Sequence, residues 1–176
     1  MLIIFAGRSG AGKTTIAREL ARALAAVYLR IDSIEQAIRE TGAIVDGSGY
    51  RVGYRVAEDN LRLGRSVVAD SVNPWPLTRE AWRDVADRAG VSAIDVEVTC
   101  SDLAEHRRRV ETRTWHIPGL RLPTWQEVVE RDYRSWDRER IVIDTAGQSA
   151  EQSVKMLRAA LAAAGDAKRN GVCDKT

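Results

Sequence analysis

The sequence has few cysteines and no long apolar run, and each shortage excludes a class of protein. Its two cysteines, Cys100 and Cys173, lie far apart and indicate neither a disulfide framework nor a metal site. No stretch approaches the roughly 20 apolar residues that a membrane-spanning helix needs. The first apolar run, Leu2–Ala6, is too short for a signal peptide. We therefore expect a cytoplasmic protein with no membrane segment.

The sequence also lacks an excess of charge of one sign, and it has very few lysines. Its 27 basic and 25 acidic residues give a net charge of +2, which by itself does not indicate a nucleic-acid partner. Only four of the 27 basic residues are lysines, and Lys13 is the only one before residue 155. A lysine kept against such a bias towards arginine indicates a position that requires lysine.

Short apolar runs alternate with amphipathic stretches along the 176 residues. The runs predict five strands, at residues 2–6, 27–31, 66–70, 93–98 and 141–144. The stretches predict a helix at about 13–26, a second that begins near 33, a third that ends near 64, and a fourth at 77–90. A long helical region is predicted at about 103–140 and a last helix at 150–164. Strands joined by helices form a parallel sheet between helical layers, so we expect a three-layer α/β fold. One domain over residues 1–164 and a disordered tail at 165–176 are expected.

Residues 7–14 read GRSGAGKT and directly follow the first predicted strand. They fit the pattern G-x-x-x-x-G-K-S/T, in which glycines let backbone N–H groups surround phosphate oxygens. The following helix directs its positive end at the same phosphates. Lys13 is predicted to reach the β- and γ-phosphates, and the Thr14 hydroxyl to bind Mg²⁺. The motif predicts a nucleoside triphosphate site formed by Gly7, Arg8, Ser9, Gly10, Ala11, Gly12, Lys13, Thr14 and Thr15.

Aspartates stand where three predicted strands end, at the edge where parallel sheets bind ligands: Asp32, Asp70 and Asp144. Asp70 is predicted to hold Mg²⁺ together with Thr14; a cap of the following turn is the alternative. Asp32 is predicted to orient a substrate hydroxyl or to accept its proton. The alternative for Asp32 is the N-cap of a helix that starts at Ser33.

Asn73 and Trp75 follow the same predicted strand as Asp70 and are candidate substrate residues. The indole of Trp75 is suited to form a wall against a planar or sugar substrate. Core packing is the alternative for Trp75, because it is seven residues from Trp82 and both can occupy one helix face.

The region at about 103–140 is rich in arginine and is interrupted at HIPGLRLP. Phosphoryl transfer needs cations near the transferred group, and Arg109 and Arg113, four apart, are predicted to share one helix face and supply them. Pro118 and Gly119 predict a hinge for a lid. An arginine-rich solvated helix is the alternative.

These stretches resemble a known group, the small P-loop kinases, over about residues 1–164. GRSGAGKTTIA is similar to the P-loop of adenylyl-sulfate kinases. RIDSIEQAI resembles the stretch with the substrate-side aspartate in chloramphenicol phosphotransferase and its relatives. VVADSVNP is similar to a pattern of polynucleotide-kinase and zeta-toxin-like proteins. RVETRTWHIP resembles the lid of gluconate kinases, with Arg109, Arg113 and His116 in matching places.

The resemblance implies a P-loop NTPase fold with sheet order 2-3-1-4-5 and a helical lid. It also implies that the loop after the last strand holds adenine, where Thr145 and Gly147 are candidates by position. The chain lacks the paired-aspartate substrate motif of shikimate kinases after its second strand, so the resemblance leaves the acceptor open.

Motifs and resemblance together favour an ATP- and Mg²⁺-dependent kinase that phosphorylates a hydroxyl group of a small molecule. One alternative is a kinase that acts on a nucleoside, a nucleotide or a polynucleotide end, which a basic groove would favour. Another is a nucleotide-binding switch that hydrolyses ATP slowly. The sequence shows no obvious glutamine or arginine to position a water molecule, and in a switch Asp32 would have no task.

Overall fold

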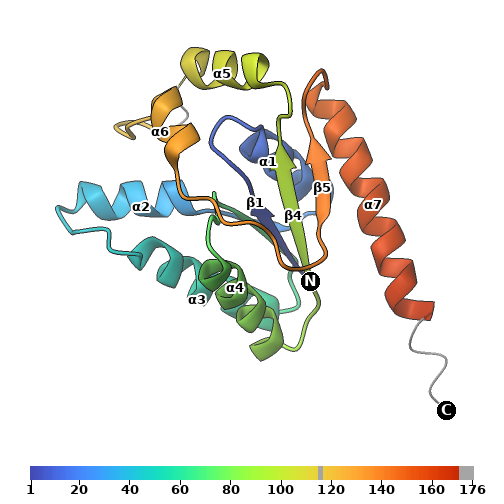
Figure 1. Cartoon of the computed structure of the whole chain (residues 1–176). Coiled ribbons are helices and arrows are strands. Elements are labelled where there is room, and N and C mark those ends of the chain that lie inside the picture. Colours follow the sequence, from blue (N-terminus) through green and yellow to red (C-terminus); the bar gives the residue numbers. More distant parts are fainter. Residues whose placement is uncertain (115–116, 171–176) are drawn as a thin grey trace.

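The protein forms a parallel sheet between two layers of helices (Figure 1). The computed structural model describes residues 1–114 and 117–170. In these residues the sheet has five strands in the order β2-β3-β1-β4-β5. The strands are β1 (Leu2–Ala6), β2 (Val27–Arg30), β3 (Val67–Asp70), β4 (Ala93–Thr99) and β5 (Ile141–Asp144). The predicted strands and the sheet order that the resemblance implies are confirmed.

Seven helices surround this sheet in the described ranges. They are α1 (Lys13–Ala23), α2 (Ile31–Glu40), α3 (Ser48–Arg62), α4 (Pro76–Arg88), α5 (Leu103–Thr112), α6 (Trp125–Glu130) and α7 (Ala150–Asn170). α1 and α7 pack together on one face, and α3 and α4 on the other, which confirms the three-layer fold. α5 and α6 lie beyond the carboxyl ends of the strands (Figure 1). None of the described helices is long and apolar enough to cross a bilayer.

The central strand β1 is apolar throughout because both of its faces are buried. Ile3 and Phe5 pack in the core beneath α1 and α7, whereas Leu2 and Ile4 pack in the core beneath α3 and α4. Burial of each such side chain contributes about 1.5–3 kcal/mol. A continuous apolar run is typical of a strand covered on both faces, and this burial fixes the position of the glycine loop that follows β1.

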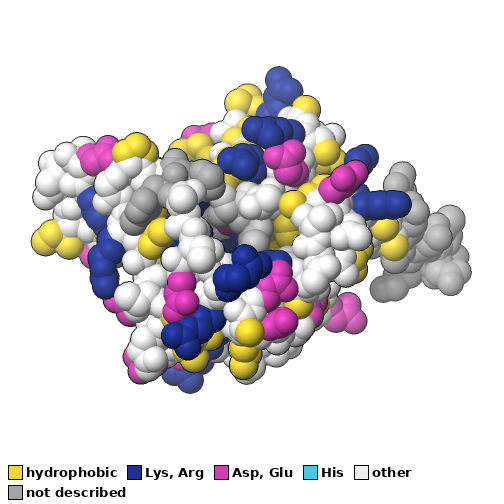
Figure 2. Space-filling model, turned by 90° about the horizontal axis from the view of Figure 1, so that it is seen from above, with side chains coloured by type: hydrophobic (Ala, Val, Ile, Leu, Met, Phe, Trp, Pro, Cys, Tyr) yellow, Lys and Arg dark blue, Asp and Glu magenta, His cyan; other side chains and the backbone are white. Residues whose placement is uncertain are grey.

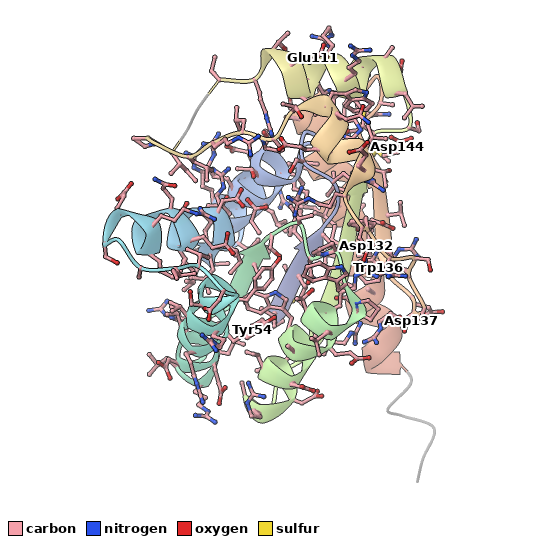
Figure 3. The ribbon with its side chains drawn as sticks, turned by 60° about the vertical axis from the view of Figure 1, so that its left-hand side comes forward. Tyr54, Glu111, Asp132, Trp136, Asp137 and Asp144 are labelled. Atoms are coloured by element: carbon pink, nitrogen blue, oxygen red, sulfur yellow. The ribbon has the colours of Figure 1, made fainter. Side chains whose placement is uncertain are left out.

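A segment at 131–140, called the strap below, connects α6 to β5. It descends past α4 and β4, with Asp132, Trp136 and Asp137 along its course (Figure 3). The strap is fastened by Arg79 of α4, which is fully buried. The Arg79 guanidinium donates to four backbone carbonyls, those of Asn73, Pro74, Arg134 and Ser135. The guanidinium carbon also lies 4.0 Å from the centre of the Trp136 ring and 5.2 Å from that of the Tyr133 ring. Arg79 thereby joins the loop after β3 to the strap.

Two helices begin or end at residues other than those that the sequence predicts. α2 begins at Ile31, before the predicted start at Ser33, and its N-cap is Arg30. α7 continues to Asn170, past the predicted end near Ala164 and into the segment predicted as a disordered tail. Alanine, lysine and arginine favour helix strongly enough that a single glycine does not end it here. Residues 171–176 lie outside the described residues.

Candidate active site

A cavity of about 330 Å³ opens at the carboxyl ends of the strands. Residues from separate parts of the chain line it: Lys13 and Thr14 from α1, Asp32 from α2, Asp70 from β3, and Arg113 after α5. Ser9, Gly10, Gly12, Thr15, Arg109 and Thr145 also line it. Its volume is within the range of ligand sites. The fold thus brings most of the predicted site residues into one cavity.

The glycine loop between β1 and α1 has a backbone that other residues could not adopt without strain. Gly10 and Gly12 have φ values of 85° and 101°. A Cβ on Gly10 would lie 2.4 Å from Val110 Cγ2, and one on Gly7 would lie 2.1 Å from the Val98 carbonyl oxygen. α1 starts without a side-chain cap and without an acidic residue in its first turn. Its N-terminal N–H groups therefore remain available for an anion.

Lys13 lies inside this loop with only 7% of its surface exposed. Its Nζ donates a hydrogen bond of 2.9 Å to the Arg8 carbonyl oxygen. Burial lowers the pKa of Lys13 to about 8, although the nearby charges of Asp70 and Asp32 oppose this shift. A phosphate group at the loop would stabilise the charged ammonium, so the site is suited to an anionic ligand.

Asp70 and Thr14 together provide oxygen ligands suited to Mg²⁺. Asp70 is buried and accepts a hydrogen bond of 2.7 Å from the Tyr28 hydroxyl. Burial raises the pKa of Asp70, whereas the Lys13 charge and hydrogen bonds from Tyr28 and Thr14 lower it. The described residues contain no cluster of three His, Cys, Asp or Glu side chains. One carboxylate and one hydroxyl fit Mg²⁺, which commonly completes its coordination with phosphates and water.

Asp32 lies in the first turn of α2, and its side chain is 45% exposed. Its Oδ2 is 3.3 Å from Arg30 Nη2. Because Arg30 occupies the N-cap and α2 has no side-chain cap, the capping alternative for Asp32 is not supported. Sequence reasoning missed Arg30, although a charged residue at the end of the apolar run VYLR was a visible signal.

The two predicted arginines of the lid differ in their contacts. α5 ends at Thr112, so Arg113 follows the helix in an extended conformation and does not share a helix face with Arg109. Arg109 donates to Thr145 Oγ1, to the Thr145 carbonyl and to Glu105. In Arg113, Nε and Nη2 are buried and find no hydrogen-bond partner in the part of the chain that the structure describes. Trp115 and His116, the second of which was matched to the lid of gluconate kinases, lie outside the described residues.

Thr145 and Gly147, the candidates for adenine binding, have different surroundings. Thr145 Oγ1 lies 2.9 Å from the carbonyl oxygens of both Ala11 and Thr99, shares its single proton between them, and so joins the glycine loop to the end of β4. Gly147 does not line the cavity; its N–H donates to Glu105. A role in adenine binding stays a prediction for both residues.

The glycine loop is also fastened to α5 and α6, which sequence reasoning missed. Arg8 donates to the carbonyls of Val128, Val129 and Arg131 at the end of α6. These carbonyls form the negative end of the helix and attract a cation. His106 Nε2 of α5 lies 2.8 Å from the Ser9 carbonyl oxygen. Arg8 thus stabilises the loop from behind, while Lys13 faces the cavity.

Asn73 and Trp75, the candidate substrate residues, do not line the cavity. The Asn73 side chain is fully buried, and its Nδ2 and Oδ1 have no hydrogen-bond partner. Trp75 is half exposed and donates its Nε1–H to Asp132 of the strap. Trp82, in contrast, is fully buried in the core. Substrate contact stays a prediction for Asn73 and Trp75.

The outer face above the cavity carries charges of both signs. Lys and Arg side chains alternate with Asp and Glu side chains when the molecule is seen from above, on the side of α5 and α6 (Figure 2). A polynucleotide groove is usually lined by charge of one sign. The face in this view therefore does not favour a polynucleotide as the acceptor.

Comparisons with known proteins agree with this architecture. A family model described as AAA domain matches residues 2–131. No curated protein matches the chain in sequence. A gluconokinase from Sinorhizobium meliloti has a similar structure, with a TM-score of 0.67 at 20% identity over 96% of this chain and 95% of that chain.

Two further solved structures are similar to this chain. The APS kinase of Mycobacterium tuberculosis, in complex with AMPPNP and APS, has a TM-score of 0.61 at 18% identity over 89% of this chain and 95% of that chain. Kti12 of Chaetomium thermophilum, in complex with ADP-AlF3, has a TM-score of 0.64 at 17% identity over 90% and 98%. At these identities the likeness shows the fold.

Proposed function

The chain belongs to the AAA domain family, and from this membership we propose that it is an ATP- and Mg²⁺-dependent kinase that phosphorylates a hydroxyl group of a small molecule. One observation carries the proposal: Lys13, Asp70 and Asp32 come from three separate segments and line one cavity. Similar structures were solved with AMPPNP and APS and with ADP-AlF3, which supports a nucleotide ligand in this fold.

The glycine loop is assigned to the β- and γ-phosphates of ATP. Backbone N–H groups of the loop and the start of α1 surround the phosphate oxygens. The Lys13 ammonium moves from the Arg8 carbonyl to the phosphates and neutralises their charge. Thr14 and Asp70 would hold Mg²⁺, which when bound supplies further positive charge to the phosphates.

Asp32 is assigned to the acceptor. Its carboxylate, partly exposed and beside Arg30, orients the acceptor hydroxyl and accepts its proton. The hydroxyl oxygen forms a bond to the γ-phosphorus as the bond from that phosphorus to the bridging oxygen breaks, and ADP leaves. Arg113 and Arg109 both line the cavity, and Arg109 is held there by Thr145. Both arginines add positive charge where negative charge develops on the transferred phosphoryl group.

A transfer assay tests the proposal. The protein is incubated with Mg²⁺, ATP labelled in the γ-phosphate and a panel of hydroxylated small molecules, nucleosides and an oligonucleotide with a free hydroxyl end. The expected result is label in a small molecule, lost in Lys13→Ala. Label only in a nucleoside or oligonucleotide would move the assignment to that acceptor class. Release of inorganic phosphate alone would overturn the kinase assignment in favour of a hydrolysing switch.

A further inference from the structure

Arginines in the cavity differ in how far the protein satisfies their hydrogen bonds. Arg109 donates to both oxygens of Thr145 and to Glu105. In Arg113, Nε and Nη2 are buried and have no hydrogen-bond partner in residues 1–114 and 117–170. In Arg30, Nε is buried and has no hydrogen-bond partner among the described residues; Asp70 Oδ2 lies 3.9 Å from it. Buried donors without a partner weaken a fold unless a ligand or water satisfies them.

The unpartnered nitrogens of Arg113 form one edge of its guanidinium. Nε–H and Nη2–H on this edge point in parallel and match the two oxygens of a carboxylate or phosphate group. Among the described residues neither nitrogen has such a partner, and the ion pair of Asp32 is with Arg30. A single neutral hydroxyl cannot satisfy both N–H groups of this edge in the same geometry, whereas an oxyanion does.

These donors lie on the acceptor side of the cavity. Arg30 ends β2, the outer strand beside β3, while Thr145 follows β5 at the opposite end of the sheet. The charges of Asp32 and Arg30, the two residues at the start of α2, act on Arg113, and Arg113 in turn acts on Lys13. Arg109, in contrast, stays bonded to Thr145. Arg30, paired with Asp32, and Arg113, on which the Asp32 charge acts, therefore line the cavity near the proposed base.

We propose that the acceptor carries an oxyanion, a carboxylate or a phosphate group, in addition to the hydroxyl that is phosphorylated, and that Arg30 and the Nε–Nη2 edge of Arg113 bind it. The proposal rests on the proposed function, because it names the class of acceptor for that reaction. Nη1 is the remaining nitrogen of the Arg113 guanidinium and serves the transferred phosphoryl group. Arg30 is a specificity-determining residue, and Asp32 beside it receives the hydroxyl.

A binding experiment tests the oxyanion directly. Glycerol, glycerate and glycerol phosphate share a hydroxylated carbon chain and differ in carrying no anion, a carboxylate or a phosphate. Each is added to protein saturated with Mg²⁺ and AMPPNP, which keeps the phosphate probe out of the glycine loop. The Nε–H signals of Arg30 and Arg113, assigned from single variants, are followed by NMR. We expect at least one acid to shift both signals and to bind at least about 10-fold more tightly than glycerol.

Matched variants assign the effect to these arginines. Arg30→Met and Arg113→Met keep a long side chain but remove the hydrogen-bond donors. Each variant should abolish the preference for the acid over glycerol. Arg22→Met, at an exposed arginine paired with Glu19 on α1, should leave it unchanged. Equal binding of glycerol and both acids, or a preference that survives in Arg30→Met, would overturn the proposal. If one variant does not fold, the Nε–H signals of the parent protein still show whether the acids bind at the arginines.

The two proposals fail in different ways. Binding of the acids needs no phosphoryl transfer, so a protein that binds them but labels no acceptor of the panel contradicts the kinase assignment and leaves the oxyanion site intact. Transfer to neutral acceptors alone, with no shift of either arginine signal, contradicts the oxyanion site and leaves the kinase intact. The carboxylate and phosphate arms show which oxyanion the site prefers.

Discussion

The two halves of the cavity differ in how completely the protein satisfies its own polar groups. In the nucleotide half, Arg109 and Thr145 make several hydrogen bonds within the protein, and Arg8 holds the glycine loop from outside the cavity. In the acceptor half, nitrogens of Arg30 and Arg113 are buried without a partner. The nucleotide half is therefore shaped before any ligand binds. The acceptor half gains its remaining hydrogen bonds from the ligand, and this half decides the specificity.

Removal of the Lys13 charge should have the largest effect of these changes, because it impairs the function of the nucleotide half. We expect Lys13→Ala to lower kcat/KM by about 10³-fold, the scale found when one preorganised charge-stabilising group is lost. The thermal unfolding midpoint should change little, because Nζ contacts only a loop carbonyl. Steady-state kinetics and circular dichroism check both. Lys13→Arg should fail as well, since a planar guanidinium does not replace a compact ammonium. Loss of the fold with normal AMPPNP binding would contradict the assignment.

Asp32→Asn should affect the acceptor half alone. We expect transfer to fall by about 10²-fold, the usual scale for loss of a general base, while AMPPNP binding stays unchanged. Single-turnover transfer and titration calorimetry separate the two effects. Asp46→Asn, at an exposed aspartate paired with Arg51, is the matched control and should transfer normally. A parental rate in Asp32→Asn would show that this carboxylate is not the base.

Alkaline pH should weaken nucleotide binding, because Lys13 loses its positive charge. Its pKa is lowered to about 8 in the free protein, and a bound phosphate favours the charged form and raises that pKa. Binding therefore takes up a proton above about pH 8, and AMPPNP affinity should fall there by up to about 10-fold per pH unit. Calorimetry over this range measures the slope. Lys13→Ala should lack it, and an unchanged slope in that variant would assign the proton to another group.

The smallest effect is expected from the back of the glycine loop. Arg8→Met removes the hydrogen bonds to the end of α6 but leaves the cavity lining intact. We expect a loss of a few degrees in the unfolding midpoint and a few-fold weaker binding of AMPPNP, because the loop is less ordered before binding. Arg107→Met, at an exposed arginine paired with Glu111, should change neither. Unchanged AMPPNP binding in Arg8→Met would show that α6 does not order the loop.

Local sequence signals were sufficient to predict the strands and the glycine loop. Leu2–Ala6 is apolar because both of its faces are buried, and this burial is visible as an uninterrupted run. Gly10 and Gly12 need positive φ values, so the motif reports a backbone conformation directly. Asp32 and Asp70 were found from their position after strands, because parallel strands end at a common edge.

Contacts between distant segments were not predictable in the same way. Arg8 binds the carbonyl of Val128, 120 residues away, and nothing near Arg8 marks that partner. Asn73 and Trp75 were chosen for their nearness to Asp70. The chain turns at Asn73, with φ of 48°, and Arg79 holds the following backbone against the strap, away from the cavity. The direction of a loop depends on such tertiary contacts, which a strand pattern does not contain.

The central place of β1 has a consequence for synthesis of the protein on the ribosome. Among the five strands β1 is made first, but Leu2 pairs with Val67 on one side and Ala93 on the other. The strand stays without sheet neighbours until β3 and β4 have emerged. At about 5–20 residues per second, the interval from Arg8 to Arg131, the last of its partners on α6, is on the order of 10 s. The glycine loop is thus translated before the segments that hold it and takes its final shape only after they have emerged, and until then an apolar strand is exposed in the nascent chain.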